Sequence, residues 1–564
     1  MESKKWLYKE INPQQIEIYK QMYDISELTA SVLAGRSELI ENGDISLEER
    51  GLEAFYDPFL MKDMGKAIDR INKAIEKNEK IVIYGDFDAD GVTSTAILHL
   101  YLHKRGANVN FYIPDRIGEG YGVNSEAIDA IKEMGTNLII TVDTGITAID
   151  DINYANNLGI DVIITDHHEP KETLPKACAI VDPKQKDCQY PFKHLAGVGV
   201  VFKLIQAFEG INNKIFDEYI AFVALGTIAD VCPLIGENRE FVKRGLKAFS
   251  KSKNKGIKAL LRVCNPNNKM ITAGLIGFVI APRINAAGRL GSAYKSVRMF
   301  LCDDDKKAEE IAWQLVEENK HRQNLEEKIF NEAIEIIEKE RLYEQQIIVV
   351  GQKGWHQGII GIVSSKITER YYRPSILISI DEEGIGRGSC RGITNFNMFD
   401  ALNACTKYVE RFGGHALAAG LTIKEENIKE LRAAINEYSK KQLKPEDFIS
   451  KINIDCKIHP KDLNLKEVEE LRKLEPFGMN NQTPVFALQK MKITRIGTMS
   501  NNKHLRMELS SGNIGIDSVF FGKGYLNGEF KLGDVVDAVG TLSINEFGGG
   551  QQLQFMLKDI KKAQ

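Results

Sequence analysis

The stretch IVIYGDFDADGVTSTA, residues 81–96, decides what kind of fold this chain can adopt. Its first five residues are apolar, β-branched or aromatic, as in a buried strand, and helical spacing begins after Gly91. Between strand and helix stand three carboxylates at every second position, Asp86, Asp88 and Asp90. Crowded carboxylates repel one another, and a divalent cation is the usual remedy. Taken alone, the stretch also fits a solvated acidic loop or a single regulatory Mg²⁺ site.

The pattern of a strand that ends in acidic residues recurs further along the chain. Apolar runs predict strands at 137–142, 160–165 and 177–181, and helical spacing fills 125–134 and 148–158. Strands that alternate with helices in this way form a doubly wound parallel sheet, an α/β fold. Because all strands of such a sheet end at the same edge, residues that are far apart in sequence should converge there.

The side chains at these strand ends are typical metal ligands. Asp143 follows the second strand, Asp166, His167 and His168 follow the third, and Asp182 follows the fourth. We expect Asp166 to orient a histidine and Asp182 to be a turn residue. Carboxylates with imidazole and without thiolate suit Mn²⁺ or Mg²⁺, and the imidazole favours Mn²⁺. So many ligands exceed the needs of one ion, which predicts two ions roughly 4 Å apart and hydrolysis of a phosphoryl group.

Several strings carry a specific family resemblance. GDFDADGVTS, VDTG, TDHH and ALGTIADVCPL resemble the motifs of the DHH phosphoesterase superfamily. APRINAAGRL at 281–290 and FGGHALAAG at 412–420 resemble its bacterial RecJ branch, the exonucleases specific for single-stranded DNA. The resemblance covers almost the whole chain. It implies hydrolysis of single-stranded DNA from 5′ to 3′ into 5′-mononucleotides by two-metal-ion catalysis, in DNA repair and recombination.

The resemblance also implies roles for individual residues. The implied metal ligands are Asp86, Asp88, Asp90, Asp143, His167 and Asp230. Catalytic roles fall on the bridging carboxylate of Asp143, on His167, on His168 facing the scissile phosphate, and on His415. The implied DNA contacts are Arg116, Arg283, Asn285, Arg387, Ser389, Arg391, Gly414 and His415, and Tyr121, close to Arg116 in the sequence, is a further candidate that could stack on a base. Plainer roles stay open, because Asp230 could cap a buried helix, an arginine commonly forms a surface ion pair, and Tyr121 could pack in its loop.

The chain divides into five predicted parts. They are an N-terminal helical segment (1–55), a DHH catalytic domain (56–302), a connecting helix (303–340), a small α/β DHH-associated substrate-binding domain (345–440) and an OB-fold single-strand-binding domain (448–564). The connecting helix is predicted because no glycine or proline interrupts that charged stretch. A coiled-coil dimer is the competing interpretation, although its seam would be unusually polar.

The last two parts were assigned from local patterns. The sequence pattern of the DHH-associated part predicts the element order strand, helix, two strands, helix, strand, helix. Its glycine-rich pieces at 386–392 and 413–415 could let the backbone approach a phosphate. In the last part, short alternating segments separated by turns predict a small OB-like barrel. A basic and aromatic track for single strands could comprise Lys503, His504, Arg506, Phe520, Phe521 and Phe547, unless the phenylalanines form the barrel core.

Composition sets wider limits. The 564 residues are 43% hydrophobic and 27% charged, as in globular proteins, and the net charge of −4 says little about nucleic acid. Eight scattered cysteines argue against a zinc module or a disulfide framework. No signal peptide or membrane-spanning stretch is evident, so we expect a cytoplasmic protein without a membrane partner, and a monomer. The family resemblance adds single-strand-binding protein and a helicase as partners.

Two other functions compete with the exonuclease interpretation. One is a phosphodiesterase for very short RNA or cyclic dinucleotides, or a pyrophosphatase, within the same superfamily. The other is a DNA-binding scaffold with a decayed site. The C-terminal barrel argues against the first, because a small-molecule hydrolase has little need of a strand-binding module. The presence of every implied ligand argues against the second.

Overall fold

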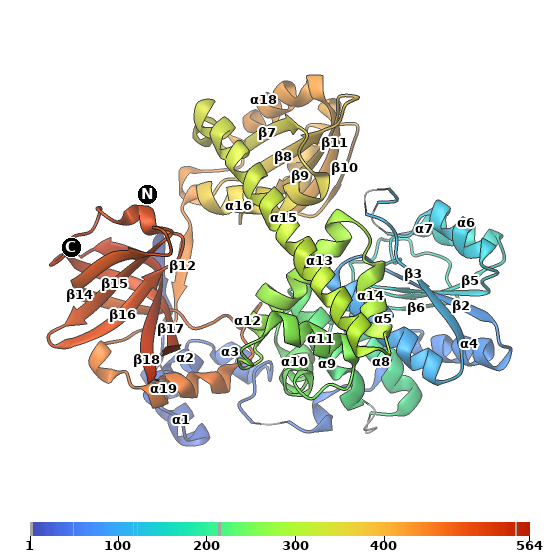
Figure 1. The fold of residues 1–564 in the computed structure, drawn as a ribbon, viewed down its shortest axis with the longest axis horizontal. Coiled ribbons are helices and arrows are strands. Elements are labelled where there is room, and N and C mark those ends of the chain that lie inside the picture. Colours follow the sequence, from blue (N-terminus) through green and yellow to red (C-terminus); the bar gives the residue numbers. More distant parts are fainter. Residues whose placement is uncertain are drawn as a thin grey trace. The chain divides into compact units, whose positions relative to one another are not determined.

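The computed structural model describes residues 4–48, 50–116, 118–120, 122–211, 216–547 and 550–563. The chain forms two compact units (Figure 1). Unit 1 combines Met1–Ala54, Pro233–Lys243 and Lys451–Gln564, and unit 2 combines Phe55–Cys232 and Arg244–Ser450. Within the described residues, none of the helices combines the length and the apolar character needed to cross a bilayer.

Unit 2 contains the predicted parallel sheet. Its order is β3-β2-β4-β5-β6, and every neighbouring pair is parallel. The strands are β2 (Lys80–Gly85), β3 (Asn108–Tyr112), β4 (Leu138–Val142), β5 (Asp161–Thr165) and β6 (Ala179–Val181). The next two strands in the chain, β3 and β4, lie on opposite sides of β2, so the direction of strand addition reverses there. Such a reversal opens a ligand-binding crevice at the carboxyl ends of the strands.

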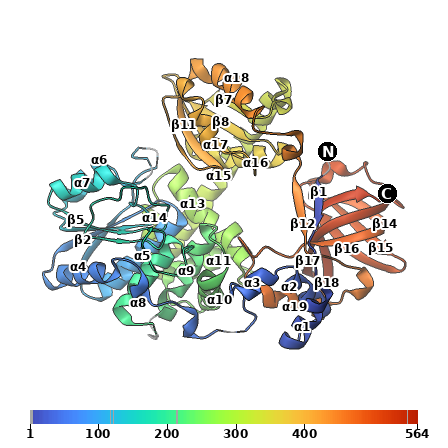
Figure 2. The same cartoon turned by 180° about the vertical axis from the view of Figure 1, so that it is seen from behind.

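Helices cover both faces of this sheet, as Figure 2 shows. One face packs against α6 (Ser125–Glu133) and α7 (Ile149–Asn157). The other face packs against α4 (Met64–Glu76), α5 (Ala89–Lys104) and α8 (Gly197–Glu209). The central strands are buried on both sides, which explains their uninterrupted apolar sequence. The predicted doubly wound α/β fold is confirmed.

A helical layer follows the sheet in the chain. It consists of α9 (Phe216–Ala229), α10 (Gly236–Phe249), α11 (Lys255–Cys264), α12 (Ala273–Leu275), α13 (Ala281–Leu290) and α14 (Tyr294–Leu301). The predicted connecting helix is α15 (Asp305–Lys339), whose 35 residues begin at an Asp304 cap. It packs on α11, α13 and α14 and, toward its end, on α16 (Gln357–Tyr371). Helices of the same chain therefore cover the apolar seam that a coiled-coil dimer would have used.

The DHH-associated part of unit 2 is a five-stranded sheet in the order β10-β11-β9-β8-β7. Its elements are β7 (Ile348–Lys353), β8 (Ser375–Ile380), β9 (Ile385–Arg391), α17 (Met398–Asn403), β10 (Arg411–Gly414), β11 (Ala418–Lys424) and α18 (Ile428–Ser439), together with α16. The sequence predicted a single strand where the structure has the hairpin of β10 and β11. Glycines hid β10, because they carry no side chain to show the alternation of a strand.

Unit 1 contains the C-terminal barrel. Its strands are β14 (Phe486–Met499), β15 (His504–Ser511), β16 (Ile514–Phe520), β17 (Val535–Phe547) and β18 (Gly550–Lys562). They pair in the order β14-β15-β16-β18-β17, and a further pairing of β14 with β17 closes the barrel. This confirms the predicted OB-like fold. Beside the barrel lie β12 (Lys451–Ile454), β13 (Cys456–Lys457) and α19 (Leu465–Glu470).

The N-terminal segment is not purely helical. It holds α1 (Pro13–Tyr23), α2 (Glu27–Ala34) and α3 (Ser37–Glu41), but it begins with β1 (Lys5–Tyr8). This strand pairs in parallel with β12, with Lys5 opposite Lys451. Four residues whose partner lies far away in sequence give no local signal, so this strand could not be predicted.

Candidate functional site

The loop between β2 and α5 brings the three clustered aspartates together. Asp88 caps α5, and its Oδ1 accepts N–H groups from Asp90 at 2.9 Å and Gly91 at 3.0 Å. A Cβ at position 91 would lie 2.4 Å from the carbonyl oxygen of Asp86, so only glycine allows this close turn. The negative side chains at the start of a helix are also stabilised by its dipole.

Two other segments complete the cluster. Asp143 follows β4 and has a left-handed backbone with φ of 59°, a conformation that aspartate tolerates. Asp230 follows α9, and the next residue, Val231, has φ of 57°. A β-branched residue in that conformation is strained, and such strain gathers at functional sites.

Histidine 167 lies at the centre of the carboxylates. Its Nε2 is 3.0 Å from Oδ1 of Asp143, 3.8 Å from Oδ2 of Asp230 and 3.9 Å from Oδ2 of Asp90. Three trios have ligand atoms within 4.8 Å of one another: Asp86, Asp88 and Asp143; Asp143, His167 and His168; and His167, Asp230 and Cys232. Asp143 belongs to two of these trios, a geometry that suits a carboxylate shared by two ions.

Like Asp88, Asp90 and Asp230 also have hydrogen-bond partners in the protein. Both oxygens of Asp90 accept N–H groups at the start of α8, from Gly197 at 2.7 Å and Val198 at 2.8 Å. The Cys232 thiol donates to Oδ2 of Asp230 at 3.1 Å. The sequence did not point to this thiol. Its place beside Asp230 brings a soft sulfur ligand close to a set of harder oxygen ligands.

The cluster is electrostatically unstable without cations. Burial raises the pKa of Asp86, Asp90 and Asp143 well above the usual value, and neighbouring aspartates raise it further. Burial lowers the pKa of His167, which keeps the ring neutral and able to bind a metal. Among the described residues, buried atoms without a hydrogen-bond partner include Oδ1 of Asp86, Oδ1 of Asp143 and Nε2 of His167. The donor set therefore fits divalent cations.

The second histidine is held by Asp166, as predicted for that carboxylate. Asp166 Oδ1 lies 2.7 Å from Nδ1 of His168 and also accepts the N–H of His167 at 2.7 Å. Burial disfavours a charged ring, but the hydrogen bond and charge of Asp166 outweigh it and raise the pKa of His168 to about 9. Asp182 accepts the N–H of Lys184 at 2.7 Å, as a turn residue does, and burial raises its pKa to about 8.

Arginines of unit 2 gather beside the carboxylates. Arg116 lies over the ring of Phe87 at 4.9 Å and interacts electrostatically with Asp86 and Asp88. Burial lowers the pKa of Arg391, and the positive charge of Arg116 lowers it further. Arg391 is fixed by hydrogen bonds to Ser365 Oγ and Ser389 Oγ, each at 3.1 Å. Three of the predicted DNA contacts thus share one positive region.

Arg289 is a functional candidate that the sequence analysis missed. It lies in the APRINAAGRL string, and its Nη1 donates to the Gly358 carbonyl at 3.2 Å. Burial lowers its pKa to about 10, with Arg116 among the nearby cations that add to the effect. A buried cation kept among other cations favours an anionic ligand. The spacing of residues in this string does not show which of its two arginines, Arg283 or Arg289, faces the site.

Other predicted contacts are placed differently. Arg283 donates to the Val279 carbonyl on its own helical stretch, and Asn285 Oδ1 accepts the N–H of Ala89 at 2.8 Å. The structure thus does not bring Arg283 to the carboxylates, and Asn285 supports the start of α5. Three further predicted contacts, Arg387, Gly414 and His415, are exposed on β9, on β10 and just after it. Tyr121, another predicted contact, lies outside the described residues.

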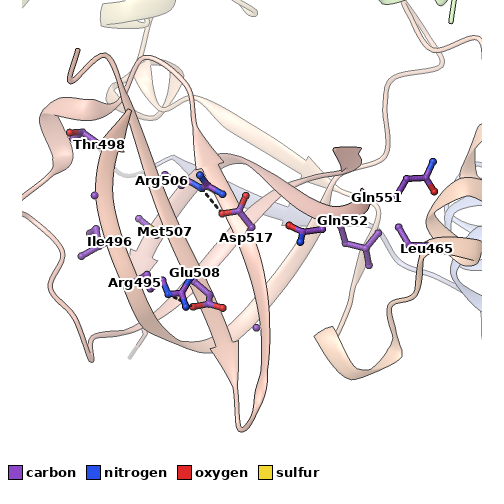
Figure 3. Close-up of a pocket in the computed structure, with 13 residues that line it drawn as sticks. Leu465, Arg495, Ile496, Thr498, Arg506, Met507, Glu508, Asp517, Gln551 and Gln552 are labelled. Carbon is purple, nitrogen blue, oxygen red and sulfur yellow. Dashed lines mark hydrogen bonds and ion pairs between the residues drawn. The ribbon is translucent and has the colours of Figure 1, made fainter. Parts of the chain in front are cut away.

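The barrel of unit 1 carries a separate groove of about 750 Å³ (Figure 3). Two ion pairs cross it, Arg506 to Asp517 at 2.8 Å and Arg495 to Glu508 at 3.4 Å. Of the predicted aromatic track, Phe520 is buried in the barrel core, whereas Phe521 is 54% exposed. The ring of Phe521 meets the ring of His504 at a centroid distance of 4.9 Å. The side chain of Phe547 is not described.

Three family models match the chain. They are the DHH family N-terminal domain at residues 80–227, the DHHA1 domain at 344–441 and the RecJ OB domain at 454–559. The first model covers the sheet with the strand-end carboxylates, the second covers the DHH-associated α/β part, and the third covers the barrel.

Similar proteins extend over nearly the whole chain. The single-stranded-DNA-specific exonuclease RecJ of Bacillus subtilis is 42% identical, over 98% of this chain and 70% of its own length. The RecJ of Haemophilus influenzae is 35% identical, over 91% of this chain and 93% of its own length. The crystal structure of RecJ in complex with Mn²⁺ from Thermus thermophilus superposes with a TM-score of 0.84 and 28% identity, covering 99% of this chain and 80% of that one. A complex of the same protein with Mg²⁺ gives a TM-score of 0.77, with 99% and 79% coverage at 26% identity.

Proposed function

Because the chain belongs to the RecJ family of single-stranded-DNA-specific exonucleases, we propose how its own residues perform that reaction. The protein hydrolyses single-stranded DNA from the 5′ end and releases 5′-mononucleotides, in DNA repair and recombination. The observation that carries this function is the buried set of carboxylate and imidazole atoms that lack protein partners at the carboxyl edge of the parallel sheet. A groove on a separate barrel suits a polymeric substrate better than a dinucleotide.

The metal-binding residues in this proposal are Asp86, Asp88, Asp90, Asp143, His167 and Asp230. When bound by these residues, two divalent cations, Mn²⁺ or Mg²⁺, would supply the charge needed to activate water and to stabilise both the attacking and the leaving oxygen. Asp143 belongs both to the trio with Asp86 and Asp88 and to the trio with His167 and His168, so its carboxylate is placed to be shared by the two ions. The N–H groups of Gly197 and Val198 orient the Asp90 carboxylate and favour its charged form, against the effect of burial.

The protonated ring of His168 is the proposed partner of the scissile phosphate. Asp166 keeps the proton on Nδ1 and the ring cationic at neutral pH. The other ring nitrogen, Nε2, then donates to a non-bridging phosphate oxygen and stabilises charge that grows in the transition state. The oxygen of the attacking water forms a bond to the phosphorus while the bond between the phosphorus and the 3′ oxygen of the terminal nucleotide breaks. The 3′ oxygen gains a proton that the water has lost, and the shortened strand keeps a 5′-phosphate.

The polarity of the enzyme is proposed to come from the arginines beside the cluster. Arg116, Arg289 and Arg391 present guanidinium groups that match a phosphate, and Ser389 adds a hydroxyl. A terminal 5′-phosphate carries more negative charge than an internal phosphodiester. It therefore binds this region preferentially and places the next phosphodiester at the carboxylates. Arg387, Gly414 and His415 would contact the following backbone, with Arg283, Asn285 and Tyr121 as more peripheral candidates.

The activity is tested with oligonucleotides labelled at either end and incubated with Mn²⁺. We expect the label of a 5′-labelled single strand to appear at once as mononucleotide, and a 3′-labelled strand to shorten progressively. A duplex of the same sequence should stay intact. Cleavage of dinucleotides alone would instead assign the site to a small-substrate phosphodiesterase, and binding without any cleavage would assign it to a scaffold.

Replacement of Arg391 should separate binding of the 5′-phosphate from catalysis. For Arg391→Gln, KM for a 5′-phosphorylated strand should rise about tenfold, because one charged hydrogen-bond donor to the phosphate is lost. The kcat should change little, and KM for a 5′-hydroxyl strand should stay close to its wild-type value. Arg370→Gln, an exposed arginine on α16, is the matched control. An equal loss on both kinds of strand would argue against a 5′-phosphate site.

The exposed ring of Phe521 is proposed to stack on a base of the single strand. Phe521→Ala should weaken binding of oligothymidylate about tenfold, because one base–aromatic stack contributes roughly 1–3 kcal/mol. Fluorescence anisotropy in EDTA measures this without cleavage. Leu532→Ala removes another exposed apolar side chain from the same unit and should have no effect. Unchanged affinity of the Phe521 variant would place the strand elsewhere on the barrel.

Several further assignments belong to this proposal. The five parts 1–55, 56–302, 303–340, 345–440 and 448–564 are proposed as its working domains. We propose that the protein acts as a monomer in the cytoplasm, where its eight cysteines would stay reduced. Single-strand-binding protein and a helicase are proposed partners, since they supply the single-stranded substrate. Sedimentation of the purified protein tests the monomer, with a concentration-dependent dimer as the contrary result.

A further inference from the structure

One thiol lies among the carboxylates and imidazoles of the metal cluster, just after α9. The Sγ atom of Cys232 donates to Oδ2 of Asp230 at 3.1 Å. Together with Nε2 of His167, these two side chains form a trio whose ligand atoms all lie within 4.8 Å of one another. The other two trios of the cluster contain only carboxylates and imidazoles. This part of the cluster therefore differs in chemistry from the rest.

The end of α9 fixes two of these three ligands. The N–H of Asp230 donates to the Gly226 carbonyl at 2.9 Å, and the N–H of Cys232 donates to the Thr227 carbonyl at 3.2 Å. Between them, Val231 has the left-handed φ of 57°. This turn holds the carboxylate and the thiol on either side of it in contact. A strained β-branched residue is kept where the surrounding structure fixes it, as happens at ligand sites.

The third ligand atom, Nε2 of His167, is available to a metal. The side chain is only 7% exposed, and among the described residues its Nε2 has no hydrogen-bond partner. Ligand atoms bound at about 2.0–2.3 Å to a tetrahedral ion lie roughly 3.3–3.8 Å from one another. Oδ2 of Asp230 lies 3.1 Å from the sulfur of Cys232 and 3.8 Å from this nitrogen. The trio thus offers three corners of a tetrahedron and leaves the fourth to water.

We propose that His167, Asp230 and Cys232 form a regulatory site for a thiophilic divalent cation of the Zn²⁺ type, whose binding switches the exonuclease off. Sulfur and imidazole ligands favour Zn²⁺ over Mn²⁺ and Mg²⁺, and the affinity of a given site is generally higher for Zn²⁺ than for Mn²⁺. On binding, the thiol proton passes to solvent and a sulfur–metal bond forms. The imidazole and the carboxylate are then lost to the catalytic ions. This inhibition rests on the proposed function, whereas binding of the thiophilic ion does not.

Oxidation is the other chemistry open to Cys232, and its surroundings argue against it. Burial raises the pKa of the thiol, and the charge of Asp230 raises it further. Cysteines that react with oxidants are those whose thiolate is stabilised, with a lowered pKa. A metal site needs no thiolate in the metal-free protein, because the incoming cation displaces the proton.

The probe is Cd²⁺, which shares the ligand preferences of Zn²⁺ and gives an ultraviolet charge-transfer band when a thiolate binds it. The full-length, metal-free protein is titrated with Cd²⁺ in the absence of Mn²⁺, and we expect a saturable band from one bound thiolate. Cys232→Ser should lack this band and bind Cd²⁺ at least about 100-fold more weakly, since loss of an outer partner of a metal site already costs about 10–100-fold. The matched control Cys178→Ser removes an exposed thiol outside the three trios and should behave as the wild type.

Further variants separate the trio from a lone thiol. His167→Gln should keep the band at saturating Cd²⁺ but bind the ion more weakly, because the imidazole ligand is lost. Cys232→Ala repeats the serine comparison without a polar atom in the buried position, and circular dichroism checks that each variant is folded. The proposal is overturned if the wild type gives no band, if the band survives in both Cys232 variants, or if His167→Gln binds Cd²⁺ as tightly as the wild type.

Inhibition is measured separately, as Mn²⁺-supported cleavage of a single strand at increasing Zn²⁺. Each protein is compared with its own rate without Zn²⁺. The Zn²⁺ concentration for half-inhibition should be about 100-fold higher for Cys232→Ser than for the wild type, and EDTA followed by excess Mn²⁺ should restore the wild-type rate. Equal sensitivity of the two proteins would overturn the regulatory role. A wild type that binds Cd²⁺ through Cys232 but cleaves no strand with Mn²⁺ would contradict the exonuclease proposal alone.

Discussion

Asp143→Asn should reduce exonuclease activity by about 10³-fold or more while the protein stays folded. Removal of one well-placed electrostatic group commonly costs 10²–10³-fold, and Asp143 is shared by two of the three ligand trios. Asparagine keeps the size of the side chain and tolerates the left-handed backbone with φ of 59° at this position. The measurement is kcat/KM on a 5′-phosphorylated single strand with Mn²⁺.

The same variant should make the metal-free protein more stable. Aspartates 86, 88, 90 and 230 raise the pKa of Asp143 beyond the effect of its burial, so loss of this one charge relieves repulsion throughout the cluster. In EDTA, the melting temperature of Asp143→Asn should therefore exceed that of the wild type. Asp150→Asn, an exposed carboxylate on α7, should change neither activity nor stability. A variant that melts lower in EDTA and keeps its activity would refute the proposed role of Asp143.

Metal removal should have the second large effect, with a defined dependence on pH. EDTA should abolish activity and lower the melting temperature by about 5–10 °C, because cations that bind only the folded state contribute about 2.7 kcal/mol each at 100 times Kd. The pKa values of Asp86, Asp90 and Asp143 are raised in the folded protein. These three groups contribute stability to the metal-free fold at pH values below about 3.9, the pKa of an aspartate in the unfolded chain. That contribution is lost as the pH rises through the pKa values that the same groups have in the folded protein.

The difference in stability between the Mn²⁺-loaded and the EDTA-treated protein should consequently widen as pH rises from about 5 to 8. Two effects act in the same direction, since cations bind deprotonated ligands and repulsion in the metal-free state grows. Thermal unfolding at three pH values, with and without Mn²⁺, measures the difference. It should be much smaller for Asp143→Asn. A difference that stays constant or narrows with pH would mean that these carboxylates do not hold the cations.

Much of the catalytic centre was predictable from sequence because its residues follow predicted strands. The short apolar runs before Asp86, Asp143 and His167 identify buried strands, and parallel strands all end at one edge. The long helix α15 was equally predictable, because a long, highly charged stretch of sequence without glycine or proline favours a continuous helix. The barrel strands followed from their alternation. In these cases a local pattern of side chains is enough to define the element.

Long-range pairing was beyond sequence reasoning. The partner of β1 lies more than four hundred residues away in the chain, and nothing in four residues specifies it. The hairpin strand β10 was hidden by glycines. Two neighbouring phenylalanines also differ in burial: Phe520, the last residue of β16, is buried in the barrel core, whereas Phe521 lies in the following turn and is exposed.

The sequence by itself determined the fold class, the edge of the sheet where chemistry occurs and most of the carboxylates placed there. Only the tertiary structure decided which cations join them: it turned Arg283 back onto its own helix and brought Arg289 among Arg116 and Arg391. The reason is physical. Strand periodicity is set by neighbours in the chain, whereas the burial and charge of a long side chain depend on segments that meet only after folding.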